Sequence, residues 1–362
     1  IYAKKITVTP SAVTISGCTI GGTTAADANK AADYGGGIYI DEGCSLTLKD
    51  GAKVIGNTAV SGGGVYNKGG SFEMTGGEIK KNKAKRGGGG VSLGLSGKSN
   101  SILNMSGGTI SGNTLTETSG KGAGVEFFTE STEHGGIHYY TKMNMSGSAK
   151  VDTNNDVYLN NSRMITVDGV LTPAGGIAAR LTPETYGTTR QVLEAGTGVN
   201  LASEAGKFAV TPKSGTPPEY WGINNTGNLT QDKTSIFNAI SNDQIKAAES
   251  SMNSTPITDR KTALEGKLIL YKTNLNNYGI MRVTAVDNTG AGYIRIDYKT
   301  FNSDGSIKKS ENNRKVNGTW PFDLDEGKDS GGDFDFWLKN LNSTDAGRHF
   351  TPANGAKFYV LP

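Results

Sequence analysis

The chain has 362 residues, with 37 basic and 34 acidic side chains and a formal net charge of +3. This near balance excludes the excess of positive charge that a nucleic-acid-binding protein concentrates on one face. No stretch approaches the roughly 18 consecutive apolar residues of a membrane-spanning helix, so we predict neither a nucleic-acid partner nor a membrane span. Since no signal peptide precedes Ile1, we expect the chain to be a processed portion of a longer protein.

Glycine is unusually frequent: 52 of the 362 residues are Gly, which is roughly twice the usual share. The apolar residues are rich in Val, Ile, Tyr and Phe, and Thr and Asn are plentiful. That mixture favours strands joined by tight turns over helices. We therefore predict an all-β fold.

One pattern recurs in the first half of the chain. A short alternating strand is followed by a Gly-containing turn, an aliphatic residue, Asn three positions later, a Gly cluster and another strand. The copies begin at Ala12, Ser45 (SLTLKDGAKVIGN, then SGGGVYN), Ser71 (SFEMTGGEIKKN, then GGGGVSL), Ile102, Lys142 and Met164. The first Gly clusters are 27 and then 26 residues apart, which suits one coil of a β-helix with three short strands.

Aligned copies give three apolar ladders, within which apolar and polar residues alternate as in half-buried strands. The ladders run through Val13, Leu46, Phe72, Leu103 and Met143, through Ile20, Val54, Ile79, Ile110 and Val151, and through Ile38, Val65, Val91, Val125 and Val157. We predict a right-handed parallel β-helix over residues 1–231, including a cap, in which Ile38, Val65 and Val91 point inward from successive coils. An open antiparallel sandwich explains neither the ladders nor the Gly clusters.

Four asparagines fall at one repeat position: Asn57, Asn82, Asn113 and Asn154. Asn tolerates left-handed corner geometry, and stacked Asn side chains hydrogen-bond along a ladder. A row of ligand-binding amides is the alternative, but Asn serves so often as a turn residue that we predict a structural role.

The two cysteines, Cys18 and Cys44, are 26 residues apart, which is one coil. Cys18 follows its strand, whereas Cys44 precedes the next one. A disulfide needs Cα atoms within about 4.4–6.8 Å, so we predict that both thiols are free.

The remainder of the chain differs from the repeats. Residues 232–259 read as a short helical linker, in which Ser241 and Gln244 form a capping-box signature. Residues 260–362 contain six or seven strand-like runs separated by turn signals, which predicts a small C-terminal β-sandwich.

The repeats resemble those of the polymorphic outer-membrane protein family of bacterial adhesins and autotransporters, which couple GG-A-[IV] with F-x-x-N. Here the first motif appears as Gly63-Gly64-Val65, and the second as Val54 to Asn57 and Ile79 to Asn82, with an aliphatic residue in place of Phe. The resemblance covers residues 12–160. It implies an extracellular or cell-surface β-helix used for adhesion or as a stalk.

Two segments are candidate binding sites. The insert FFTESTEHGGIHYYT, from Phe127 to Thr141, interrupts the repeats, and inserts projecting from a scaffold often carry function. Its predicted contact residues are His134, His138, Tyr139 and Tyr140. The Gly pair between the histidines argues against a helical metal site there.

An acidic run in the second half is the other candidate: Asp323, Asp325, Glu326, Asp329, Asp333 and Asp335. The spacing resembles calcium-binding loops, although the Gly and terminal Glu of an EF-hand are misplaced. We predict calcium as the one possible cofactor, with Asp323, Asp325 and Asp329 as ligands. The alternative is that Asp is favoured locally in turns.

These features predict a non-catalytic bacterial surface or secreted protein that contacts a host surface protein or a polysaccharide. The alternatives are a glycan-binding protein and a polysaccharide lyase or glycosidase, which needs ionisable groups converging on one outer face. Glu73 is the only ionisable residue that we identify in the outward row of the first strands, so it would be the natural acid or base. The sequence predicts no oligomeric state.

Overall fold

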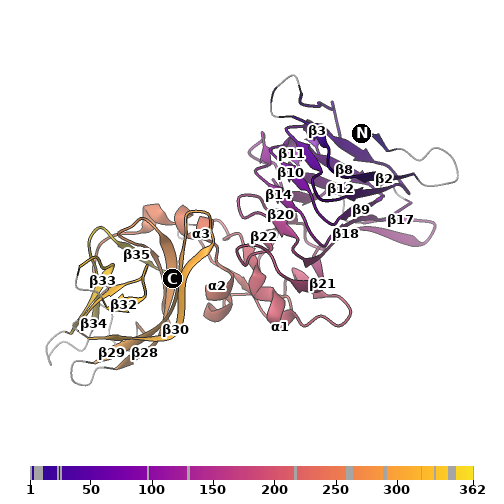
Figure 1. Ribbon diagram of the computed structural model, residues 1–362. Coiled ribbons are helices and arrows are strands. Elements are labelled where there is room, and N and C mark those ends of the chain that lie inside the picture. The colour runs from indigo at the N-terminus through magenta and orange to yellow at the C-terminus, as the bar shows by residue number, and fades with distance from the viewer. Residues whose placement is uncertain are drawn as a thin grey trace. The chain divides into compact units, whose positions relative to one another are not determined.

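A computed structural model describes residues 2–3, 11–22, 24, 27–95, 98–128, 131–215, 218–257, 264–287, 292–318, 320–329, 332–340 and 348–361. Strands account for 48% of the chain and helices for 8%, which confirms the all-β class. The chain divides into two compact units (Figure 1). Unit 1 comprises Ile1–Lys213 and Tyr220–Gln231, and unit 2 comprises Ser214–Glu219 and Asp232–Pro362.

Unit 1 contains parallel sheets to which successive repeats each add one strand. We name them sheets A to D. Sheet A consists of β1 (Tyr2–Ala3), β4 (Ile38–Ile40), β8 (Val65–Lys68), β12 (Val91–Gly94), β16 (Val125–Phe127), β20 (Val157–Leu159), β22 (Ala179–Pro183) and β24 (Phe208–Val210). Sheet B consists of β2 (Ala12–Ile15), β5 (Ser45–Leu48), β9 (Ser71–Met74), β13 (Ser101–Met105), β18 (Ile137–Gly147), β21 (Ile165–Leu171) and β23 (Leu193–Ala195).

The two smaller sheets hold the strands between B and A. Sheet C consists of β3 (Thr19–Gly21), β6 (Lys53–Ile55), β10 (Glu78–Lys80), β14 (Thr109–Ser111) and β19 (Lys150–Val151). Sheet D consists of β7 (Thr58–Ser61), β11 (Lys83–Gly87) and β15 (Thr114–Leu115). Unit 1 also contains α1 (Leu201–Glu204), a 3-10 turn (Ala205–Lys207), β25 (Gly222–Ile223) and β26 (Leu229–Thr230).

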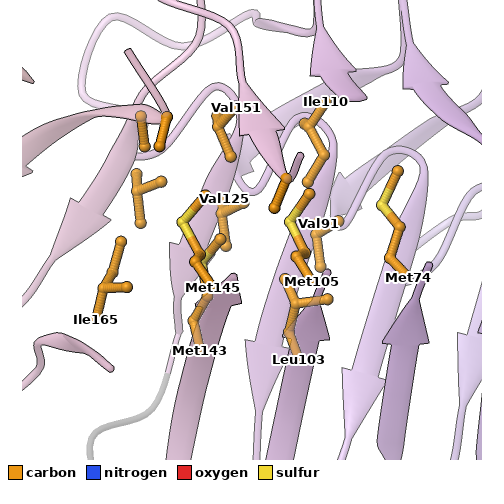
Figure 2. Packing of buried hydrophobic residues seen from close by; sticks show 14 of the residues in the cluster. Met74, Val91, Leu103, Met105, Ile110, Val125, Met143, Met145, Val151 and Ile165 are labelled. Carbon is orange, nitrogen blue, oxygen red and sulfur yellow. The ribbon is translucent and has the colours of Figure 1, made fainter. Parts of the chain in front are cut away.

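The strand registers confirm the predicted ladders. Ile38 pairs with Val65, and Val65 with Val91, so equivalent residues of neighbouring repeats lie side by side. All three side chains are buried in the core, as predicted. Figure 2 shows the inner side chains of three sheets meeting in this core: Val91 and Val125 of sheet A, Leu103, Met105, Met143 and Met145 of sheet B, and Ile110 and Val151 of sheet C.

A buried asparagine ladder runs along unit 1 beside this core. In each step the backbone N–H and the side-chain amide of one Asn both donate to Oδ1 of the next, as from Asn57 to Asn82 at 2.9 and 3.0 Å. The same pair of bonds links Asn82 to Asn113, and Asn113 to Asn155. Asn29 begins the ladder by donating to Asn57. The stacked, structural role of these residues is therefore confirmed.

The prediction was wrong at the fourth copy, where the ladder uses Asn155 and not Asn154. The turn there contains one extra residue after Val151, which moves the buried position along by one. Asn154 is exposed, and its Oδ1 accepts only the N–H of Gly112, at 3.3 Å, among the hydrogen bonds of the described residues. Asn29 was missed because no Val, Ile or Leu precedes it by three positions.

The Gly clusters have a steric cause next to the ladder. A Cβ at Gly64 would lie 2.7 Å from the carbonyl oxygen of Gly90 and 2.9 Å from Nδ2 of Asn82. Both distances are shorter than a carbon atom tolerates, so the close approach of neighbouring repeats requires Gly. This explains why a Gly cluster follows Asn29, Asn57 and Asn82 in the sequence.

We expect Asn155→Asp to lower the free energy of unfolding by about 3 kcal/mol. The change removes the buried amide donor to the Asn113 carbonyl and places a carboxylate there without a cation. Asn154→Asp is the matched control and should stay within about 0.5 kcal/mol, because it is exposed and keeps its acceptor oxygen. Urea unfolding of both variants checks this, and an equal loss in the two would contradict the ladder register.

The stack also depends on its apolar residues. Leu103 is fully buried between Phe72 and Met143, so Leu103→Ala should cost about 2–5 kcal/mol through the cavity that it leaves. Glu73→Gln, on the outer face of the same sheet, keeps the oxygen that accepts from Asn104. It should change the free energy of unfolding by no more than about 0.5 kcal/mol. Thermal unfolding of both variants measures the difference. Similar losses of stability in the two would contradict the claim that apolar core packing is the main stabilising interaction of unit 1.

Unit 2 contains two antiparallel sheets. The larger has the order β30 (Ile307–Asn317), β29 (Tyr293–Phe301), β28 (Tyr278–Asp287), β27 (Leu268–Lys272) and β35 (Lys357–Val360). The smaller has the order β32 (Lys328–Asp329), β31 (Pro321–Asp323), β33 (Phe336–Asn340) and β34 (Arg348–Pro352). Aromatic rings of the two sheets are in contact: the ring centroids of Tyr298, in β29, and Phe322, in β31, are 5.8 Å apart.

Two short helices precede these sheets and belong to unit 2. They are α2 (Lys233–Ala239) and α3 (Asn242–Ala247), followed by a 3-10 turn (Glu249–Ser251). The predicted capping box is present, since Gln244 N–H donates to Ser241 Oγ and Ser241 N–H donates to Gln244 Oε1. Both helices contact β28. No helix within the described ranges is long and apolar enough to cross a membrane.

Both cysteines are free, as predicted. Cys18 is exposed and Cys44 is buried. The inner position of Cys44 in the core of unit 1 means that it packs as a small apolar residue.

Candidate functional site

The outer face of sheet A carries one continuous row of polar and aromatic side chains. Strand pairing aligns Tyr39 with Tyr66, Tyr66 with Ser92, Ser92 with Glu126, and Glu126 with Tyr158. Equivalent residues in paired parallel strands point to the same face. The row therefore places aromatic rings at one end and a carboxylate and a phenol at the other.

Four rings form what we call the aromatic cluster: Tyr34, Tyr39, Tyr66 and Phe128. The ring centroid of Tyr66 lies 4.5 Å from that of Tyr34, 5.6 Å from Tyr39 and 6.3 Å from Phe128. Tyr66 is only 4% exposed, whereas Tyr34 and Phe128 are 42% and 45% exposed. Tyr66 is thus the buried centre of the cluster, and the partly exposed rings of Tyr34 and Phe128 form its solvent-facing surface. Burial raises the pKa of the Tyr66 phenol.

The local sequence makes room for this arrangement. A Cβ at Gly94 would lie 2.3 Å from the hydroxyl oxygen of Tyr66, so any larger residue there would displace the ring. Next to the cluster lies a hollow of about 510 Å³. Its lining includes Tyr34, Tyr39, Asn29, Lys30 and Asp33.

Glu126 is a buried carboxylate in the same row, only 8% exposed. It accepts a hydrogen bond from Ser92 Oγ at 3.2 Å. A Cβ at Gly87 would lie 2.1 Å from its carboxyl carbon, so the group lies directly against the Gly87 backbone. Burial raises the pKa of the Glu126 carboxyl to about 7, against the opposing effects of the Ser92 hydrogen bond and the charge of Lys121.

A polar group follows Glu126 along the row. Lys121 Nζ donates to the Tyr158 hydroxyl at 2.7 Å and lies 3.3 Å from Glu184 Oε1. The Tyr158 hydrogen bond is the main reason why the pKa of Lys121 is raised. Two carboxylates, an ammonium group and a phenol therefore gather on one outer face.

The pH dependence of stability tests the state of Glu126. Its folded pKa is raised from 4.5 to about 7, so its stabilising contribution is complete below pH 4.5 and is lost as the pH rises through 7. We expect the free energy of unfolding of the wild type to fall over this range relative to Glu126→Gln, which has no proton to lose. Urea unfolding at several pH values measures the difference, and parallel pH profiles would contradict the raised pKa.

The predicted binding insert forms a hairpin. β17 (Ser131–His134) pairs antiparallel with the beginning of β18 around Gly135 and Gly136, both at positive φ. The hairpin projects from the neighbouring strands (Figure 1). All four predicted contact residues lie in this hairpin. His134, His138 and Tyr140 are exposed, and Tyr139 is half-buried.

The two histidines of the hairpin do not lie together. His138 lies opposite Glu133, with Nε2 3.9 Å from Oε2, whereas His134 lies opposite Ile137. Successive residue pairs of a hairpin point to opposite faces, so the two imidazoles cannot hold one metal ion between them. Ligand contact by these residues stays a prediction.

The outward row of sheet B differs from expectation in one respect. Strand pairing extends it past Asn144 to Thr166 and Glu194, so Glu73 is not the only carboxylate in the row. Glu73 accepts from Asn104, and Glu194 from Thr166. Three strands lie between β9, which carries Glu73, and β23, which carries Glu194, so the two carboxylates are too far apart to act on one bond.

Unit 2 holds a buried aspartate cluster that could bind a metal ion. It consists of Asp323, Asp325 and Asp335, each of which offers a carboxylate oxygen within 4.8 Å of the others. Two of the three predicted calcium ligands are therefore brought together. The third, Asp329, is outside the cluster, because it lies in β32, with Oδ1 3.9 Å from Arg314. Asp335 enters instead, from the residue before β33.

Two site residues that we did not predict, Glu126 and Asp335, were only partly indicated by the sequence. Glu126 directly follows the inner residue Val125, which marks it as outward on sheet A, but its burial depends on Gly87 and Ser92 in other repeats. Asp335 stood in the predicted acidic run, and its meeting with Asp323 depends on the pairing of β31 with β33.

No protein-family model, curated protein or solved structure matches this chain.

Proposed function

We propose that unit 1 is a right-handed parallel β-helix serving as an adhesive module of a bacterial surface or secreted protein, and that its aromatic cluster binds polysaccharide. Unit 2 is, in this proposal, a small β-sandwich joined to it. The in-register parallel sheets and the asparagine ladder support the β-helix. The resemblance of the repeats to surface adhesins supports the extracellular location.

The observation that carries the glycan proposal is the pair of partly open rings, Tyr34 and Phe128, supported from below by Tyr66. Exposed large apolar side chains gathered in one place mark an interaction site more often than scattered ones do. Sugar rings present C–H groups on their faces, which pack against aromatic rings, and hydroxyls at their edges, which need hydrogen-bond partners.

Polar partners for sugar hydroxyls lie on both sides of the cluster. Asn29, Lys30 and Asp33 line the adjoining hollow, and Lys121 with Glu184 follows farther along the outer face. Binding sites for small ligands typically combine aromatic walls with a few such polar groups. The partly exposed groups, Tyr34 and Phe128 in the cluster and Lys121 with Glu184 farther along the face, suit an extended polysaccharide chain better than a compact ligand.

Cleavage of the bound glycan is the second candidate function, and Glu126 favours it. A carboxyl with a raised pKa is the form that a general acid requires near neutral pH. Lys121 and Glu184 lie on the same face. Against this, Glu126 is 8% exposed, and a proton donor must reach the glycosidic oxygen. Binding without cleavage therefore remains the first proposal.

We expect Tyr34→Ala and Phe128→Ala each to weaken glycan binding about tenfold, the loss expected when one aromatic contact of about 1.4 kcal/mol is removed. Tyr140→Ala is the matched control, because it removes a ring of similar exposure, 40%, from the hairpin. A glycan array identifies the ligand, and calorimetric titration of the three variants measures the change in Kd.

The outcomes separate the candidates. Loss of binding in Tyr140→Ala but not in Tyr34→Ala would transfer the site to the hairpin, and absence of any glycan ligand would contradict the proposal. Release of shorter oligosaccharides by the wild type, abolished in a folded Glu126→Gln variant, would establish the enzyme.

A further inference from the structure

The aspartate cluster of unit 2 brings three negative charges together with little to neutralise them. Asp323, Asp325 and Asp335 are 7%, 3% and 0% exposed. Within the described residues, the cation paired with them is Lys308, whose Nζ lies 3.3 Å from Asp325 Oδ1. With all three carboxylates ionised, the group keeps two negative charges, and uncompensated charge is costly to bury.

Most of the carboxylate oxygens have structural partners that explain why Asp occupies these positions. Asp335 accepts backbone N–H groups from Asn274 and Leu324, each at 2.8 Å. Asp323 Oδ1 accepts the N–H groups of Asp325 and Glu326 in the turn after β31. These neutral donors orient the carboxylates, but they do not remove the excess charge.

One oxygen of the cluster has no such role. Asp325 Oδ1 accepts from Asn277 at 2.9 Å and faces Lys308, but Oδ2 of the same group is buried without a hydrogen-bond partner in the part of the chain that is described. A buried carboxylate oxygen without a donor costs free energy. The carboxylate that carries this oxygen lies beside two others, which indicates that something other than a side chain satisfies it.

We propose that the aspartate cluster binds one divalent cation, and that the cation is calcium. An ion of charge +2 would balance the two excess negative charges and would satisfy Asp325 Oδ2. Two oxygens on opposite sides of a calcium ion are about 4.6–5.2 Å apart, so oxygens that all lie within 4.8 Å of one another fit around one ion. This inference is independent of the glycan proposal, which concerns unit 1.

The chemistry of the ligands selects the ion. Carboxylate oxygens suit hard cations, and the cluster contains no His or Cys that would favour zinc. Magnesium demands a near-ideal octahedron and retains several waters, whereas calcium accepts irregular geometry and a larger, mixed oxygen set. Three buried carboxylates, two from the end of β31 and the turn after it and one from the residue before β33, match calcium better.

Protonation is the competing way to neutralise the cluster. Burial, together with the neighbouring carboxylates, raises the pKa of Asp335 to about 7, and burial also raises that of Asp323. A proton on Asp335 would remove one charge and would supply an O–H donor to a neighbouring carboxylate oxygen, but it would leave the group with one excess negative charge. The two explanations differ in whether added calcium changes the protein at pH 8.

The test uses the full chain, treated with a chelator and dialysed, at pH 8. Titration with calcium chloride should show one ion bound per chain with a Kd no weaker than about 1 mM, and should raise the Tm of unit 2 by about 5 °C or more at saturation. Asp325→Asn should abolish both effects. Asp329→Asn is the matched control and should retain them, because Asp329 lies outside the cluster.

Terbium luminescence on the wild type, displaced by calcium, gives a second measurement if Asp325→Asn fails to fold. Absence of calcium binding by both calorimetry and terbium displacement would overturn the proposal and assign the cluster to protonation. A response to magnesium but not to calcium would overturn the choice of ion. Equal loss of binding in Asp325→Asn and Asp329→Asn would place the ion elsewhere.

Discussion

Unit 1 depends on in-register stacking, in which a residue must lie directly beside its equivalent in the next repeat. The asparagine ladder is the strictest form of this constraint. The inner ladder residues, Asn57, Asn82 and Asn113, each accept two hydrogen bonds at Oδ1 and donate through both the N–H and the side-chain amide. Asp has no amide to donate, and Ala has neither group. Because the ladder holds neighbouring repeats in register, their backbones approach closely at the Gly clusters, where a Cβ would clash. The inner strand positions are apolar because they form the core.

The same constraint leaves the outer positions free and so makes the aromatic cluster possible. Tyr39 and Tyr66 stack because β4 and β8 are paired, and adjacent strands lie about 4.8 Å apart. Phe128 follows β16, two strands from Tyr66 along sheet A, and the ring of Tyr66 reaches toward it across Gly94. Rings that are far apart in sequence therefore form one surface without any cost to the core.

Features that repeat with a fixed period could be predicted from the sequence, whereas features that depend on contacts between distant residues could not. The inner ladders through Val65 and Val91 were identified because apolar alternation repeats with a fixed period. Asn155 was mistaken for its neighbour because one extra turn residue leaves the composition of the repeat unchanged. Glu126 carried no periodic signal, since outward positions vary freely. In unit 2, the acidic run indicated an ion site, but only the pairing of distant strands shows that Asp335, and not Asp329, completes the group.

The glycan proposal joins these observations, because it explains why a scaffold with otherwise variable outer rows keeps four aromatic rings together. A crystal structure of the full chain with its tightest-binding oligosaccharide tests it most directly. The proposal predicts a sugar ring packed against Tyr34 and Phe128, with hydroxyls reaching toward Asp33 or Lys30. An oligosaccharide bound at the β17–β18 hairpin, with Tyr34 and Phe128 still open to solvent, would contradict it.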